Sequence, residues 1–468
     1  MGHATPLGPV KWLAKRGPPT LESTLPRLPF GATMRLETPS VPEEATQQVP
    51  VEDRIVKWSA LTLIDSPGVL QGFRSSQISF RAGVARAFSL TLLVVSIFGC
   101  NTEVGEKELA RHPIVDSLSI DPAGAIRISR SPVTHGPLAS FGERLNARHS
   151  PVMIGILEGE SEYLLGQVGG GAFLGDGSLA VLDRQVRLIR VYDPRGIHVQ
   201  TLGGPGEGPG ELNAPMAVVA AGPSELWVVD GARMIHRFSL VQGKLAFHDR
   251  ITLESFPRDA CAVGESIILH APGHMPDAGA SDVLFRLDRH GAPEAQFAAP
   301  YRYHHFLAAD RMRRGSVACA GDDLVLLGFE AQNRLDGYRI SDGELVWHAT
   351  FDGLRIPAVR EAQLPDGRRS LEVDWQREPV THFLLGMSGG GELPVLVQFG
   401  RRLQEDILEG RDRYAVETFI VDPPTGQGMY LGDELAQILA INTHRVALLH
   451  PEPFPRVEVA TLGAVSRP

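Results

Sequence analysis

The chain has 468 residues, of which 50 are Gly and 35 are Pro, together about 18% against about 12% in average proteins. This excess of chain-breaking residues excludes a helix-rich or coiled-coil protein, while 43% hydrophobic residues are enough for a sizeable core. The formal net charge of −10 gives no general attraction to nucleic acids or anionic lipids, so we expect no nucleic-acid partner.

The first 80 residues lack the periodic apolar pattern that a folded segment requires. Residues 1–68 contain ten Pro, so we predict that residues 1–80 are disordered or stem from an over-extended gene start. A peptide from residues 1–60, detected by mass spectrometry of the native protein, would contradict an over-extended start.

Residues 81–100 have the features of a bacterial signal peptide. Arg81 and Arg86 precede a 12-residue uncharged apolar run at residues 87–98, too short for the ~30 Å core of a membrane. The run leads into Gly99 and Cys100, and this ending resembles the lipobox of bacterial lipoproteins, whose cysteine is acylated. The resemblance implies a lipid on Cys100 and a place in the bacterial cell envelope, at the outer membrane or the periplasmic face. A buried helix with Cys100 as a small apolar residue is the alternative.

Residues 101–150 are predicted to be a tether and lead-in to a domain at residues 151–468. After residue 150, apolar residues recur with a period of two in short runs, without a convincing helical stretch. Four such runs at residues 171–202 are repeated at 216–253, and Asp183 and Asp230 align with a period of 47 residues. Weaker copies follow at residues 259–300, 316–351, 381–432 and 434–462. Four strands per unit, with a period in the forties, indicate the blades of a β-propeller.

The count of units predicts an all-β, six-bladed propeller with four-stranded blades. The last unit has three strands, so we expect a strand within residues 151–166 to complete it and close the ring. Residues 169–215 resemble the NHL repeat and, more closely, six-bladed propeller lipoproteins of environmental bacteria, whose blade junction GxGEGPGE matches residues 204–212. Residues 116–129 resemble the lead-in of that group. The resemblance implies a fold and an envelope location, and it implies no activity.

Two glycine-rich segments could be mistaken for catalytic motifs. Residues 203–210 (GGPGEGPG) are interpreted as a tight junction between blades, because a phosphate loop needs a following Lys and helix. Residues 386–391 (GMSGGG) do not match a nucleophile elbow, which also needs a following helix. We find no arrangement of Ser, His and Asp that indicates a hydrolase.

Asp183 and Asp230 occupy equivalent places in two blades, followed by Arg184 and Arg233. Because equivalent positions of a propeller form a ring, these four side chains are candidate ligand contacts on one face. The alternative is that the two carboxylates accept hydrogen bonds from the backbone of the turns that follow them.

His270 and His274, with Asp277, are the densest set of ligand-type residues. Zinc needs three or four converging ligands, which this loop does not supply, so we predict no metal and no cofactor and keep the two histidines as candidate ligand contacts. Cys261 and Cys319 lie in equivalent ACA sequences. Inner strands of neighbouring blades usually diverge beyond the ~7 Å Cα limit for a disulfide, so we expect two buried thiols, with a bridge as the alternative that export allows.

These patterns favour a monomeric, lipid-anchored binding or scaffolding module for a protein, peptide or glycan ligand, rather than an enzyme. Its only contact with a membrane would be through the lipid anchor. The alternative is a propeller enzyme, either a metal-dependent lactonase or hydrolase or a lyase, with a divalent ion in the axial channel. That alternative requires a channel metal held by three protein ligands.

Overall fold

A computed structural model describes residues 124–131, 135–272, 282–298, 306–357, 359–363, 369–373 and 379–464, without the side chains of residues 306–309, 359–363 and 369–373. The predicted extension (residues 1–80), the signal segment (residues 81–100) with Cys100, and His274 lie outside the described residues.

The first half of the described chain forms three four-stranded antiparallel sheets, which we call blades 1 to 3. Blade 1 consists of β3 (Val168–Phe173), β4 (Leu179–Asp183), β5 (Leu188–Tyr192) and β6 (His198–Gly203). Blade 2 consists of β7 (Pro215–Ala220), β8 (Glu225–Asp230), β9 (Met234–Val241) and β10 (Lys244–Thr252). Blade 3 consists of β11 (Asp259–Val263), β12 (Ser266–His270), β13 (Leu284–Leu287) and β14 (Pro293–Phe297).

Three further blades follow. Blade 4 consists of β15 (Gly315–Ala320), β16 (Leu324–Phe329), β17 (Leu335–Arg339) and β18 (Leu345–Phe351). Blade 5 consists of β21 (Val380–Gly389), β22 (Val395–Leu403), β23 (Ala415–Val421) and β24 (Gly428–Gly432). Blade 6 consists of β25 (Gln437–Ile441), β26 (Arg445–His450), β27 (Arg456–Thr461) and the early strand β2 (His149–Ile154).

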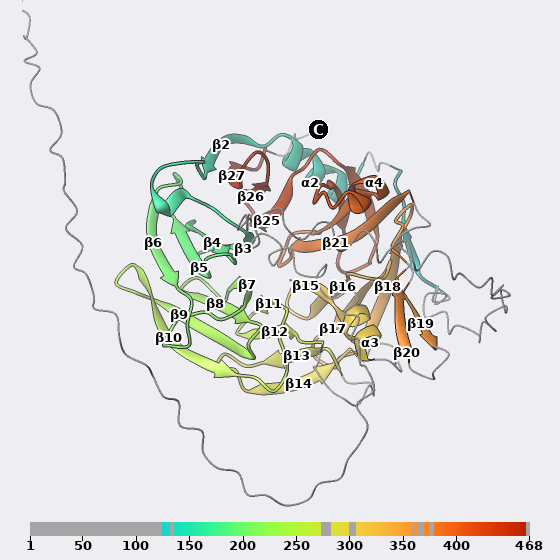
Figure 1. Cartoon of the computed structure of the whole chain (residues 1–468), viewed down its shortest axis with the longest axis horizontal. Coiled ribbons are helices and arrows are strands. Elements are labelled where there is room, and N and C mark those ends of the chain that lie inside the picture. The colour runs from blue at the N-terminus through green and yellow to red at the C-terminus, as the bar shows by residue number, and fades with distance from the viewer. Residues whose placement is uncertain are drawn as a thin grey trace, which may run out of the picture. The chain divides into compact units, whose positions relative to one another are not determined.

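The inner strands β3, β7, β11, β15, β21 and β25 contact one another in this order, and β25 also contacts β3. The blades therefore form a closed ring (Figure 1). This arrangement confirms the predicted six-bladed propeller with four-stranded blades. The ring closes as predicted, because β2 pairs antiparallel with β27 and completes blade 6. The closing strand covers residues 149–154 and so overlaps the beginning of the expected segment, residues 151–166. The rest of that segment leads to blade 1 and includes the short helix η3 (Ser161–Tyr163).

Each blade is held by packing on both faces of its sheet. Six clusters of buried hydrophobic side chains occur among the described residues, one at each seam between neighbouring blades. On β4, Leu182 packs in the cluster shared with blade 2, while its neighbour Val181 packs in the cluster shared with blade 6. Both are fully buried, and burial of such a side chain contributes about 1.5–3 kcal/mol. The period-two pattern therefore reflects two buried faces that serve two different seams.

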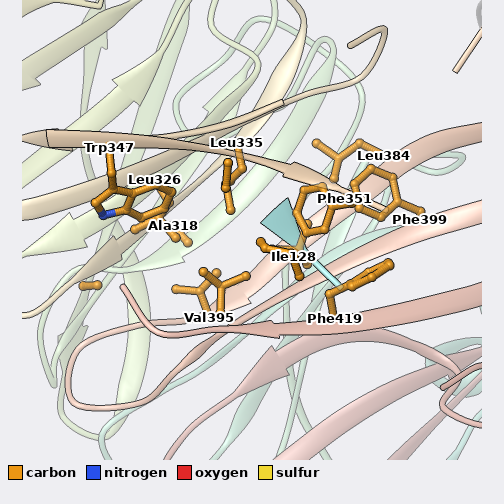
Figure 2. Close-up of a cluster of buried hydrophobic side chains, with 14 residues drawn as sticks. Ile128, Ala318, Leu326, Leu335, Trp347, Phe351, Leu384, Val395, Phe399 and Phe419 are labelled. Atoms are coloured by element: carbon orange, nitrogen blue, oxygen red, sulfur yellow. The ribbon is translucent and has the colours of Figure 1, made fainter. Parts of the chain in front are cut away.

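The lead-in contributes two elements to the propeller. β1 (Ile126–Ile128) adds a fifth strand, parallel to β18, at the outer edge of blade 4. Its Ile128 is fully buried at the seam between blades 4 and 5, among Phe351, Phe399 and Phe419 (Figure 2). The helix α2 (Pro137–Asn146) buries Leu145 at the seam between blades 5 and 6.

Short elements outside the blades correct one expectation. The sequence showed no convincing helical stretch after residue 150, whereas α3 (Phe306–Arg313) and α4 (Gln404–Leu408) both lie in connections beyond it. Helices of 8 and 5 residues are too short to give a clear helical period, which explains why the pattern missed them. A hairpin of β19 (Val359–Gln363) and β20 (Arg369–Val373) occupies the long insertion between blades 4 and 5.

The first glycine-rich segment forms a junction between blades, as predicted, and the second ends a strand without a helix after it. The junction between β6 and β7 folds back on itself, with the Leu212 N–H donating to the Gly204 carbonyl at 2.7 Å, and no helix follows it. The segment at residues 386–391 ends β21 and attaches it to blade 4, because the Gly391 N–H donates to the Cys319 carbonyl at 3.2 Å. A Cβ atom at Gly390 would lie 1.8 Å from that carbonyl oxygen, so this close approach requires glycine.

A candidate ligand-binding cleft

Asp183 and Asp230 are fully buried at the ends of β4 and β8. Each accepts a hydrogen bond from the N–H two residues later, at 3.1 Å from Gln185 and 2.9 Å from Ala232. Each also accepts one from the strand connection 17 residues earlier, at Gly166 and at Asn213. Asp183 is further bonded to Arg190, with 2.9 Å between Nη1 and Oδ2. Both carboxylates are thus engaged in joining each blade to the connection that precedes it.

The two arginines predicted beside them lie in different surroundings. The guanidinium group of Arg184 donates to the carbonyl of Met216 on the neighbouring inner strand. Burial lowers the pKa of Arg184, although the carboxylate of Asp259 acts in the opposite direction. Arg233 donates to the carbonyl of Leu253 at 3.0 Å, in the connection between blades 2 and 3. Among the described contacts, these two guanidinium groups therefore share no common partner.

His270 is fully buried at the end of β12, with Nε2 at 2.9 Å from the carbonyl oxygen of Arg313. Burial lowers the pKa of His270 to about 4, so the ring is neutral at pH 7. Within the part of the chain that the structure describes, no group of three or more His, Cys, Asp or Glu side chains has the arrangement of a metal site. The metal-dependent alternative stays a prediction.

The structure shows a cleft at the seam between blades 3 and 4, with a volume of about 490 Å³. Blade 3 contributes the turn between β11 and β12, together with side chains from β13 and β14 and their connection. Blade 4 contributes the turn between β15 and β16 and the residue after β17. The lining residues are Val263, Gly264, Glu265, Ser266, Arg286, Asp288, Arg289, His290, Glu294, Asp322, Asp323 and Ile340.

Carboxylates dominate the charge of this cleft, with five acidic side chains against two arginines. One arginine is already paired, because Arg286 Nε lies 2.8 Å from Glu294 Oε2. The backbone N–H of Ala292 donates to Asp288 and holds the pKa of that carboxyl below its usual value. Glu265 and Asp322 are exposed at the tips of the two facing turns. The cleft therefore presents an excess of acidic side chains.

The walls of the cleft are cross-linked. Cys261 on β11 and Cys319 on β15 form a disulfide, with 5.5 Å between their Cα atoms. The expected pair of free thiols was therefore wrong. The reason lies two residues earlier, where Asp259 accepts hydrogen bonds from Ser316 Oγ at 2.6 Å and from the Val317 N–H at 3.0 Å. This carboxylate draws the two inner strands together, within the reach of a disulfide.

The cleft lies at the opposite ends of the blades from the candidate residues predicted from the sequence. Asp183, Asp230 and His270 end the second strand of their blades, whereas the cleft is built on turns between first and second strands. A signal was present in the repeat itself, since each ACA sequence leads into an acidic turn, at residues 264–266 (GES) and 321–323 (GDD). Gly264 and Gly321 share the same φ of +56°, so the two turns begin with the same backbone conformation.

No protein-family profile matches this sequence, and no curated protein matches it. Among solved structures, the chain is similar to a Bacteroides fragilis protein described as exported, with 11% identity and a TM-score of 0.47 over 73% of this chain and 100% of that one. It is also similar to a member of the DUF4221 family from Bacteroides vulgatus, with 10% identity and a TM-score of 0.44 over 67% of this chain and 96% of that one. The resemblance to NHL-like lipoproteins stays a prediction. None of the helices in the described ranges has the length and apolarity that crossing a membrane requires.

Proposed function

We propose that this propeller is a binding module for a cationic ligand, namely a lysine- or arginine-bearing segment of a peptide or protein, and that the ligand occupies the cleft between blades 3 and 4. The observation that carries the proposal is the excess of five carboxylates over two guanidinium groups in one concave seam. The cleft volume of about 490 Å³ lies in the range of small-ligand sites, about 300–1,000 Å³.

Two further features support a cationic ligand. The net charge of −10 attracts cations over a distance and raises their rate of association. The disulfide and the Asp259 carboxylate fix the spacing of the inner strands from which the cleft turns extend. A preformed cleft reduces the ordering that binding would otherwise require.

The test is calorimetric titration of the oxidised full chain with tetralysine, with tetraglutamate as the probe of opposite charge. The double variant Glu265→Gln/Asp322→Asn removes two exposed carboxylates from the cleft. It should weaken tetralysine binding by about three- to tenfold, as expected for two exposed charge pairs. The matched control is Glu158→Gln/Glu160→Gln, which removes two exposed carboxylates from the connection between β2 and β3. Equal effects of the two double variants would contradict the proposal.

We also propose that the module works in the cell envelope, attached through a lipid on Cys100. The support comes from the apolar run at residues 87–98 that leads to Gly99 and Cys100. The disulfide between Cys261 and Cys319 adds to it, because disulfides persist in oxidising compartments. The test is intact-mass analysis of the native protein, which should show a diacyl or triacyl mass on a chain that begins at Cys100. Unmodified Cys100 would contradict the attachment.

A further inference from the structure

The cleft begins directly beyond the disulfide. On blade 3, Cys261 is followed by the turn at residues 263–266, which forms one wall. On blade 4, Cys319 is followed by the turn at residues 321–323, which forms the facing wall. The disulfide is thus the covalent link nearest to the two acidic turns, and it holds both at a fixed separation.

Contacts other than the disulfide also keep blades 3 and 4 together. The Asp259 carboxylate binds Ser316 and Val317 at the beginning of β11 and β15. The buried cluster of this seam includes Ile268, which pairs with Cys261 in the blade 3 sheet, and it extends to Val263 and Ile340 at the cleft. Blade 4 is also fixed to blade 5, because the Gly321 N–H donates to the Gly391 carbonyl at 2.8 Å. Opening the disulfide therefore leaves the seam closed by these contacts and removes the covalent link between the two acidic turns.

We propose that the Cys261–Cys319 disulfide controls the cleft: the oxidised chain presents a preformed acidic cleft, and reduction by a dithiol loosens it and weakens the binding of cationic ligands. This inference rests on the proposed function, since it describes the regulation of the same site.

The exchange is balanced by the dithiol itself. Cys319 is 5% exposed and Cys261 is half-buried, so the dithiol thiolate attacks the sulfur of Cys261 and the Cys319 thiolate leaves. The second thiol of the reductant then displaces Cys261 from the mixed disulfide. Two electrons pass from the dithiol to the cystine, which yields two cysteine thiols and one oxidised dithiol.

The experiment compares the oxidised full chain with the same chain after treatment with dithiothreitol, by hydrogen exchange and by titration with tetralysine. We expect faster exchange at residues 263–266 and 321–324, with unchanged exchange in β22 and β26. We expect tetralysine to bind about tenfold more weakly after reduction, because a loosened cleft must be ordered on binding. The double variant Cys261→Ser/Cys319→Ser should match the reduced chain and be insensitive to dithiothreitol.

The possible outcomes separate this inference from the proposed function. If the oxidised chain discriminates between the Glu265→Gln/Asp322→Asn and Glu158→Gln/Glu160→Gln variants, the proposed function holds. If, in that case, reduction leaves exchange and affinity unchanged, the redox control is overturned. Exchange that rises throughout the propeller overturns it as well, because the disulfide would then maintain the whole fold. Local loosening without any tetralysine binding before or after reduction overturns both proposals.

Discussion

Arg130 Nη2 lies 2.5 Å from Glu417 Oε2, although the two residues are 287 positions apart in the chain. Arg130 follows β1 at the edge of blade 4, and Glu417 lies on β23 of blade 5. The guanidinium group also stacks on Tyr430, at 4.9 Å from the ring centroid. The lead-in therefore joins the outer parts of two blades, and its strand β1 is part of the fold.

Neutralising Glu417 should make stability less dependent on pH. Burial alone would raise the pKa of Glu417, but hydrogen bonds from His382 and Arg130 outweigh it and lower the pKa to about 2, from 4.5. A lowered pKa stabilises the fold above pH 4.5, and this contribution is lost as the pH falls from 4.5 toward 2. Glu417→Gln should lower the free energy of unfolding at pH 7 by about 1–3 kcal/mol, and the difference from the parent chain should shrink below pH 4.5. Urea unfolding at several pH values measures it, and a difference that stays constant would contradict the account.

Removing the side chain of Ile128 should destabilise the propeller, although the residue lies before the first blade. Ile128→Ala leaves a cavity at the seam between blades 4 and 5 and should cost about 2–5 kcal/mol in the free energy of unfolding. Leu408→Ala is the matched control, because Leu408 is 68% exposed and its loss should change stability by less than about 0.5 kcal/mol. If both variants changed the free energy of unfolding by similar, small amounts, the lead-in would not pack against blades 4 and 5.

His270 should make the fold sensitive to mild acid. Its pKa is lowered by burial from 6.5 to about 4, so between these values the unfolded chain binds a proton that the folded chain does not. Stability contributed by the neutral ring is present above pH 6.5 and falls as the pH decreases toward 4, by up to about 1.4 kcal/mol per pH unit. Replacing His270 with Gln should flatten this dependence, whereas His444→Gln, at an exposed position, should not. A steep slope that persists in the His270 variant would be inconsistent with this assignment.

Cys261 and Cys319 should resist alkylation until the chain is reduced. Mass mapping of the chain purified without reductant should recover residues 261 and 319 in one cross-linked peptide pair. The Cys261→Ser/Cys319→Ser variant should yield these two peptides separately, without a cross-linked pair. Free thiols at both positions in the native chain would contradict the bridge.

The fold could be predicted because each blade carries its own evidence. The neighbouring residues Val181 and Leu182 pack on opposite faces, so their apolar pattern indicates two buried faces. The equivalent positions of Asp183 and Asp230 indicate the repeat. Even the closing strand follows from counting, since a sheet lacking one strand must obtain it elsewhere.

The cleft could not be predicted in the same way, because its two walls are about 58 residues apart in the sequence and meet only through packing of blades 3 and 4. The partner of the buried His270 is the Arg313 carbonyl, 43 residues away in the chain, which no local pattern reveals. The disulfide depends on the Asp259 carboxylate drawing β11 to β15, which a general expectation about diverging inner strands does not include.

The most direct test of the proposed site is to couple the amines of tetralysine to nearby carboxylates with a water-soluble carbodiimide, at low ionic strength where screening is weak. The modified residues are then mapped by mass spectrometry on the oxidised full chain. We expect preferential coupling to Glu265, Asp322 and the other acidic residues of the cleft, with little at Glu158 and Glu160. Equal coupling at Glu158, Glu160 and the cleft residues would contradict a cation-binding cleft between blades 3 and 4.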